Sequence, residues 1–201
     1  RDAQESRGLG DVYKRQVADD ALLVVGRQGG VASLGIDYFE PLGTVYLYDL
    51  GENRVPDVFA VEQQLSDYID ENIEKCLGSF ELLSDKGIEV IVKSPPKTTT
   101  TIAEKDVRFS ISYDLEERKG DMAIIPEFAP VLKAVRLKEM LQLADDIVSS
   151  EAKNSGLFDL DVDCSLDVTH FPLEKTLVTV ITDRNFLMQG EPYRFVFAHR
   201  R

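Results

Sequence analysis

The chain has 201 residues, of which 43% are hydrophobic and 29% are charged, and its formal net charge is −13. This length suits one domain with its own hydrophobic core, and the composition predicts a folded chain rather than a disordered one. The negative charge argues against nucleic acid or an anionic membrane as the main partner, and no segment has the roughly 18 continuous apolar residues of a membrane span.

The first sixteen residues, Arg1 to Gln16, differ in character from the rest of the chain. They show no apolar period, and a helical pattern begins abruptly at Val17. The part from Asp11 to Gln16 (DVYKRQ) resembles the translation of a transposon-end adapter used in sequencing libraries, and the part before it resembles the tail seen ahead of that adapter in metagenome translations. We therefore predict that residues 1–16 are a non-native, adapter-derived tail and are unpacked, the alternative being an ordinary disordered N-terminus.

Two helices and a strand are predicted in the next part of the chain. Val17 to Arg27 has apolar residues at helical spacing and ends at Gly29-Gly30, which is typical of the last turns of a truncated helix. Thr44 to Leu50 is predicted as a strand from its β-branched and aromatic content. Pro56 to about Leu77 is predicted as a long helix because one apolar stripe runs along it. That stripe consists of Val58, Val61, Leu65, Ile69, Ile73 and Cys76.

The remainder alternates between strands and one more helix. Four strand-like runs precede a hairpin turn at Lys119-Gly120-Asp121, which leads to Met122–Ile125. Pro130 to Lys153 is predicted as a second long helix, and Leu177–Thr182 is predicted to pair with Tyr193–Ala198. The fold class is therefore α+β, an antiparallel sheet packed by two long helices plus the truncated N-terminal helix, with residues 17–201 as a single domain. The four runs are Phe80–Leu83, Gly87–Lys93, Thr98–Ala103 and Val107–Leu115.

The two histidines do not lie in a metal-binding spacing. His170 is placed in a predicted turn before Phe171-Pro172, and His199 follows the predicted final strand. Both are therefore expected at the surface rather than as ligands or catalytic groups. The sequence predicts no metal site, no cofactor and no catalytic residue.

Two other patterns were weighed as sites. The glycines of Gly26 to Gly30 follow a helix and lack the Lys-Ser/Thr pair of a phosphate-binding loop, so they indicate a turn that ends the helix. Asp159, Asp161 and Asp163 share one face of a predicted strand, which indicates a solvated face. Weak Ca²⁺ binding is the alternative, although the glycine and distal glutamate of an EF-hand loop are absent. Glycosidase chemistry would need two carboxylates converging on a cleft, usually with aromatic platforms, and the chain has no tryptophan.

The two cysteines, Cys76 and Cys164, both fall on apolar faces by their spacing and are predicted to be structural. The spacing leaves open whether they form one disulfide or remain two buried thiols. A catalytic cysteine would need partial exposure and a neighbouring cation or histidine, whereas the stripe of the first long helix directs Cys76 inward.

Four segments after Val17 form a recognisable series. They are Ala21-Leu22-Leu23 with Gly26 to Gly30, Gly51 to Pro56, Leu65 to Ile73 with Cys76, and Gly190 to Ala198. This series resembles an uncharacterised archaeal family of membrane-anchored surface proteins, known mainly from metagenome-derived genomes. The resemblance implies a short N-terminal membrane helix, a domain outside the cell, and a cysteine ahead of the equivalent of Val17 as the natural partner of Cys76 in an oxidising compartment. No activity is established for the family, so no catalytic residue is implied.

These observations predict a non-enzymatic, extracytoplasmic domain of a single-pass membrane-anchored surface protein, with a structural or interaction role. Its partner would be an unknown protein or surface, and membrane contact would be made only through a missing N-terminal helix. One alternative is a binding module for a small ligand or peptide in a pocket between the sheet and the helices. The other is a hydrolase with a dispersed active site, which a deep cleft with three converging polar residues would favour.

Overall fold

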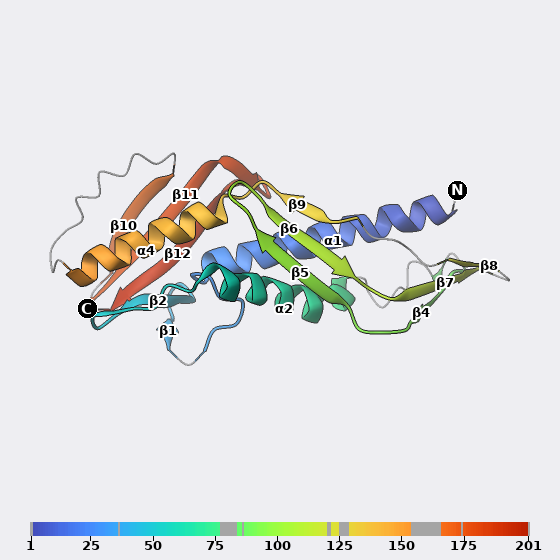
Figure 1. Cartoon of the computed structure of the whole chain (residues 1–201), viewed down its shortest axis with the longest axis horizontal. Helices are drawn as coiled ribbons and strands as arrows, with labels where there is room; N and C mark the ends of the chain where they lie inside the picture. The colour runs from blue at the N-terminus through green and yellow to red at the C-terminus, as the bar shows by residue number, and fades with distance from the viewer. Residues whose placement is uncertain are drawn as a thin grey trace.

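In the computed structural model the chain is elongated, and the start of helix α1 and the end of strand β12 lie at opposite ends (Figure 1). The structure describes residues 2–35, 37–76, 84–85, 87–119, 122–124, 129–153, 166–173 and 175–200. The predicted strand Phe80–Leu83, the acidic run Asp159–Asp163, and Cys164 lie outside these residues. No helix of the described residues is both long and apolar enough to cross a membrane.

The main sheet is built mostly from the C-terminal part of the chain. Its strands follow the order β1 (Tyr38–Phe39), β2 (Thr44–Asp49), β12 (Glu191–Arg200), β11 (Thr176–Met188) and β10 (Asp167–Leu173), and β3 (Glu52–Asn53) pairs with β2. All pairs are antiparallel except β12 with β2. The predicted pairing of Leu177–Thr182 with Tyr193–Ala198 is confirmed, since Thr182 lies opposite Arg194. Gln189 and Gly190, both with positive φ, make the tight turn between β11 and β12.

Two smaller sheets use the middle of the chain. The second sheet has the order β5 (Lys97–Ile102), β6 (Val107–Ser112) and β9 (Val131–Lys133), and the third has the order β4 (Glu89–Val92), β7 (Leu115–Lys119) and β8 (Met122–Ile124). The predicted strand Val107–Leu115 is thus divided between two sheets. The predicted hairpin at Lys119–Asp121 is confirmed by the pairing of Lys119 with Met122.

Helix α2 (Val58–Cys76) confirms the predicted helix but begins just after Pro56, its predicted first residue. The side chain of Asp57 caps it by accepting a 2.7 Å hydrogen bond from the Ala60 N–H. The apolar stripe is confirmed at four positions, which are all buried: Val61, Leu65, Ile69 and Ile73.

The polar side of α2 faces the edge of the second sheet. Glu62 Oε1 accepts the Ile102 N–H at 2.7 Å, and Ser66 Oγ accepts the Thr100 N–H at 3.1 Å. Four helical residues rise about 6 Å, and two strand residues advance about 6.6 Å, so side chains four apart on α2 match N–H groups two apart on β5. The helix therefore satisfies the edge of β5, which would otherwise be open to pairing with another strand.

Helix α4 (Leu137–Lys153) starts later than predicted. The helix predicted from Pro130 is wrong over its first residues, because Val131–Lys133 forms β9 and pairs with β6. Val131 and Val135 are nevertheless buried. Their spacing, which suggested a helix, belongs instead to a strand and the link that follows it.

Helix α1 runs from Asp2 to Arg27, so the predicted unpacked tail is corrected. The side chain of Lys14 is buried, donates a hydrogen bond to the Ala129 carbonyl at 3.3 Å, and pairs with Asp11 at 2.8 Å. The adapter origin of residues 1–16 and the domain boundary at residue 17 remain predictions. The helix ends as predicted: Gly29 has a φ of 74°, and the Gly30 N–H donates to the Val25 carbonyl at 2.9 Å.

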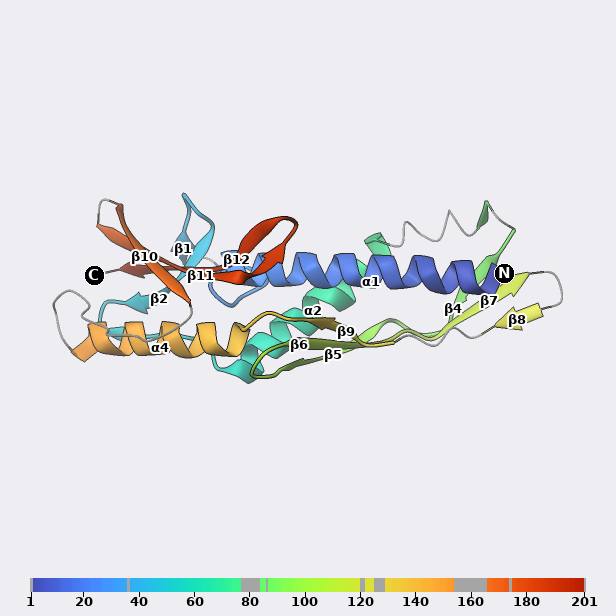
Figure 2. The same ribbon diagram turned by 90° about the horizontal axis from the view of Figure 1, so that it is seen from above.

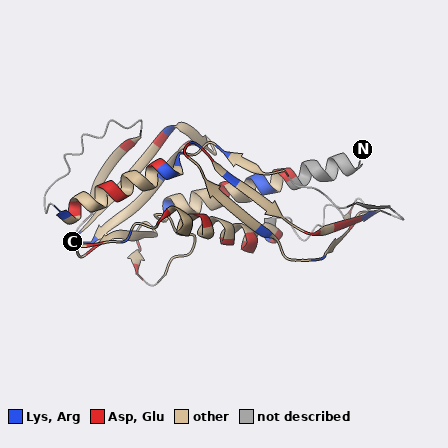
Figure 3. Ribbon diagram, viewed as in Figure 1, with Lys and Arg blue, Asp and Glu red and all other residues tan. Residues whose placement is uncertain are grey.

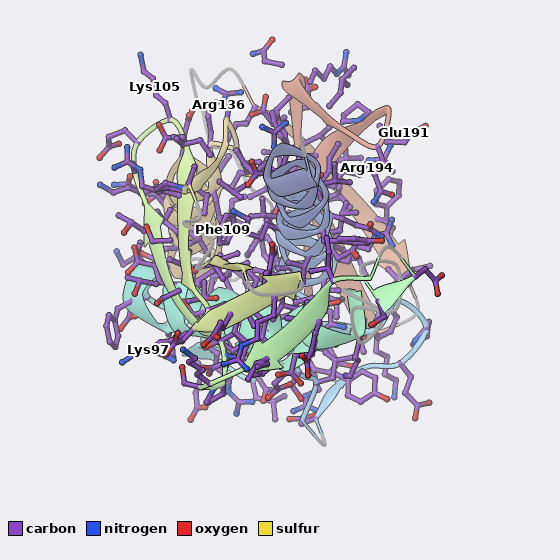
Figure 4. The ribbon with its side chains drawn as sticks, turned by 90° about the vertical axis from the view of Figure 1, so that its right-hand side faces the viewer. Lys97, Lys105, Phe109, Arg136, Glu191 and Arg194 are labelled. Carbon is purple, nitrogen blue, oxygen red and sulfur yellow. The ribbon has the colours of Figure 1, made fainter. Side chains whose placement is uncertain are left out.

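The last turns of α1 pack closely on the main sheet. A Cβ added at Gly26 would lie 2.5 Å from the Arg194 carbonyl oxygen, so only glycine permits this approach. The Tyr193 hydroxyl donates to the Leu22 carbonyl at 2.9 Å across the same contact. Viewed along the long axis, α1 lies between the second sheet, which carries Phe109, and the main sheet, which carries Arg194 (Figure 4).

The α+β class with antiparallel sheets is confirmed. The predicted packing of two long helices on one sheet is not confirmed, because α2 lies along β5 of the second sheet whereas α4 contacts β2 and β3 of the main sheet.

Candidate functional site

The two faces of the main sheet differ in chemistry. Side chains alternate along each strand, and the register places them in rows across β10, β11 and β12. One face, here called the inner face, is turned toward α1 and α4 and includes His170, Thr179, Ile181, Phe195, Phe197 and His199. The opposite face, here called the outer face, includes Thr169, Phe171, Val178, Val180, Arg194 and Val196.

Four polar side chains form a hydrogen-bonded series on the inner face, here called the polar chain. His199 Nδ1 lies 2.5 Å from Oε2 of Glu151, which belongs to the last turn of α4. His199 Nε2 lies 2.8 Å from Thr179 Oγ1, and His170 Nδ1 lies 2.9 Å from the same oxygen. Thr179 and His199 are 0% exposed.

The sequence-based placement of the histidines is corrected by this arrangement. His199 lies inside β12 and is buried, not at the surface after the last strand. His170 lies in β10 and is half-buried, not in a turn. Strands β10 and β12 extend beyond the apolar alternation in the sequence, because hydrogen-bonded polar side chains occupy further positions on the inner face.

The direction of the hydrogen bonds follows from the inventory of donors and acceptors. An ionised Glu151 can only accept, so His199 donates to it from Nδ1. In the tautomer that carries its proton on Nδ1, His199 accepts the Thr179 hydroxyl proton at Nε2. Thr179 Oγ1 then accepts from His170 Nδ1. Burial, and next the neighbouring His199, lower the pKa of His170, while Glu151 opposes the shift.

Hydroxyl, imidazole and carboxylate stand here in the order of a hydrolase triad. A nucleophile must nevertheless reach its substrate, and Thr179 is fully buried. None of the three hollows described below is lined by a member of the polar chain. The polar chain therefore joins α4 to β10, β11 and β12, and the Thr179 hydroxyl is buried within that contact. Within the described part of the chain, no group of three or more His, Cys, Asp or Glu side chains could hold a metal ion.

The outer face carries an open hollow of about 620 Å³. Strands β1 and β10 lie on the side of the sheet away from α4 (Figure 2). The hollow is lined by residues of β10, β11 and β12 and by Leu42, which lies between β1 and β2. Three apolar side chains at its rim, Leu42, Phe171 and Leu173, are 41–50% exposed. The remaining lining side chains are Thr169, Val178, Val180, Thr182, Arg194 and Val196.

The rows of the outer face change from apolar to polar along the strands. Phe171 and Val178 are paired in one row, Thr169 and Val180 in the next, and Asp167, Thr182 and Arg194 in the third. Asp167 forms an ion pair with Arg184. Arg194 has a carboxylate of Glu191 at 3.9 Å, the outer limit of an ion pair. The hollow thus combines an apolar floor with one weakly engaged cation.

A second hollow, of about 480 Å³, is polar and surrounds a strong ion pair. Arg136 binds both carboxylate oxygens of Asp183, at 2.7 and 3.0 Å. Burial alone would raise the pKa of Asp183, but hydrogen bonds from Arg136 and the Asn185 N–H hold it below its usual range. The pair joins the start of α4 to the irregular part of β11, which gives it a structural role. Lys105 also lines this hollow, and Figure 4 shows it near Arg136.

A third hollow, of about 400 Å³, lies between the start of α2 and α4 and includes Val58 and Leu141. Asp57 and Asp145 lie at the same hollow, and acidic side chains recur along both helices (Figure 3). Its charged side chains include Lys138, which is already paired with Glu104.

Sequence reasoning missed both features of the main sheet. No residue of the polar chain or the outer hollow was singled out as a site. The sequence singled out Cys76 and Cys164 instead, as structural cysteines. Cys76 is the last residue of α2, and its side chain, like the whole of Cys164, lies outside the described residues. Their structural role stays a prediction.

Comparison with known proteins assigns no relative to this chain. It matches no protein-family model, and no curated protein or solved structure is similar to it.

Proposed function

We propose that this chain is a non-enzymatic binding domain that takes an apolar ligand into the hollow on the outer face of the main sheet. The observation that carries the proposal is the half-exposed group of Leu42, Phe171 and Leu173 around a 620 Å³ hollow. Binding sites for small molecules have volumes of about 300–1,000 Å³ and mostly apolar linings. Contiguous exposed apolar side chains mark surfaces that a partner covers.

A place at the outer surface of a cell belongs to the same proposal and rests on the sequence resemblance. Helix α1 starts at the end of the molecule far from the main sheet (Figure 1). An anchor that continued α1 ahead of Val17 would lead away from the main sheet and from the hollow on its outer face. The ligand would then reach the outer face from the surrounding medium.

The test uses an uncharged fluorescent apolar probe, N-phenyl-1-naphthylamine. Binding to the full chain is measured by fluorescence titration, and Phe171→Ser is compared with Phe59→Ser. Phe59 is a matched control because it is 74% exposed on α2 and does not line the hollow. Covering a phenylalanine side chain stabilises by about 1.5–3 kcal/mol, so Phe171→Ser is expected to weaken binding about tenfold or more. Equal weakening by both variants, or no binding by the unaltered chain, contradicts the proposal.

A hydrolase is the second candidate, favoured by the order of Thr179, His199 and Glu151 in the polar chain. A fluorophosphonate probe transfers its phosphonyl group to an activated hydroxyl with loss of fluoride. The binding-domain proposal expects no labelling of Thr179, because its hydroxyl is buried. Labelling of Thr179 that disappears in His199→Ala would favour the hydrolase instead.

A further inference from the structure

We propose that the hollow on the outer face selects single-chain amphiphiles that end in a carboxylate, and that Arg194 pairs with this group. The inference rests on the proposed function, since it requires that the hollow binds an apolar ligand. It adds the charge of the ligand and the direction in which the ligand lies.

The row order of the outer face sets the direction. Arg194 and Thr182 lie opposite each other, and Val196 and Val180 form the next row toward the apolar end of the hollow. Rows two residues apart are separated by about 6.8 Å in an antiparallel sheet. An alkyl chain lying along the strands would cover the valines and reach Phe171, while its head group would lie beside Arg194.

The charge of the head group follows from the state of Arg194. It is the one basic residue among the described side chains that line the hollow, and none of them is acidic. Its carboxylate neighbour Glu191 stands at 3.9 Å, whereas Arg136 reaches Asp183 at 2.7 Å. A guanidinium at that distance keeps most of its hydrogen-bonding capacity for a ligand, and arginine binds carboxylates in a bidentate geometry.

Because the molecule as a whole is negatively charged, the Arg194 guanidinium decides whether a carboxylate ligand binds in the hollow. The chain carries a formal charge of −13, so an anion is repelled by most of its surface. Binding of a carboxylate in the hollow therefore depends on the local interaction with Arg194. A cationic amphiphile would place its head group against this guanidinium and would bind less well there.

The experiment measures displacement of N-phenyl-1-naphthylamine from the full chain by decanoate, decanol and decyltrimethylammonium, each below its micelle concentration. Decanoate is expected to bind about tenfold more tightly than decyltrimethylammonium. Added salt should weaken the binding of decanoate more than that of the other two amphiphiles. Arg194→Gln should remove this preference, which is judged within the variant by comparing how well the three amphiphiles displace the probe from it. Arg108→Gln is the matched control, since Arg108 is exposed on β6 outside the hollow.

The outcomes separate the two proposals. If the uncharged probe does not bind the unaltered chain, the proposed function fails. If the probe binds but the three amphiphiles compete equally, or Arg194→Gln leaves the decanoate preference intact, the selection of carboxylates is overturned while the binding function stands. A peptide with an apolar, free C-terminus shares the carboxylate chemistry, and tighter competition by such a peptide than by decanoate would overturn the choice of an amphiphile.

Discussion

Each face of the main sheet carries some side chains that the usual distribution of residue types would place on the other face. The inner face buries Glu151, Thr179 and His199, whereas the outer face leaves Phe171 and Leu173 half-exposed. The buried polar groups are tolerated because hydrogen bonds replace the water they lose. The exposed apolar groups have no comparable compensation until something covers them. The comparison teaches that the inner face is closed by its own contacts, while the outer face leaves apolar side chains that the proposed ligand would cover.

The largest expected effect tests whether the inner face is closed. His199→Ala removes a fully buried ring and its hydrogen bonds to Glu151 and Thr179. Truncating a large buried ring to alanine costs about 3–5 kcal/mol, and Glu151 also loses a hydrogen-bond donor, so we expect a loss of that order in the free energy of unfolding. Urea denaturation measures it. A loss below about 1 kcal/mol would show that the polar chain contributes little to the inner face.

A smaller effect is expected where α1 meets the main sheet. An alanine usually stabilises a helix by about 1 kcal/mol relative to glycine, but at Gly26 its Cβ would press against the Arg194 carbonyl oxygen. We expect Gly26→Ala to destabilise by about 1–3 kcal/mol, as overpacking does. Gly35→Ala is the control, because a Cβ at Gly35 has no neighbour within 4 Å. Thermal unfolding of both variants is the measurement, and a stabilised Gly26→Ala would contradict the close approach.

The outer face should respond in the opposite way to the inner face. Phe171→Ser is expected to change the free energy of unfolding by no more than about 1 kcal/mol, because the ring is already half in water. The same substitution should weaken ligand binding strongly. Urea denaturation without ligand checks the stability, and a loss as large as that of His199→Ala would assign Phe171 to the core.

The smallest effect concerns pH. His170 has a lowered pKa in the folded chain, below its ordinary value of 6.5, so the folded chain binds this proton less readily than the unfolded chain. As the pH falls through 6.5 toward the lowered pKa, the unfolded chain holds more protons, and stability must decrease. We expect His170→Gln to reduce the pH dependence of the urea midpoint between pH 7.5 and 5.5. An unchanged dependence would remove His170 from the acid response.

Periodicity in the sequence predicts those elements whose conformation is set by residues close together in the chain. The buried stripe of α2 and the pairing of β11 with β12 could be predicted because apolar residues recur at regular short intervals along the helix and along each strand. The helix predicted from Pro130 failed at its start because Val131 suits a strand as well as a helix, and pairing with β6 decided between them.

The candidate sites depend on contacts that no local period contains. Glu151 and His199 are 48 residues apart in sequence. Each belongs to an element whose pattern of apolar residues does not predict a buried polar side chain. The outer hollow consists of ordinary strand residues whose exposure depends on what covers the sheet. One signal was available, since Thr179 lies two residues from both Leu177 and Ile181 and so shares their face.

The contact between α2 and β5 matches two backbone repeats of unequal length. Each step of four helical residues falls short of two strand residues by about 0.6 Å, so the shortfall is about 0.6 Å after one step and about 1.2 Å after two. Glu62 and Ser66 reach their strand partners. At the next step Asp70 stands beside Thr98: burial raises the pKa of Asp70, and hydrogen bonds from the side chain and backbone of Thr98 oppose that rise. The shortfall grows with every further step, so a straight helix can cover only a short strand edge in this way.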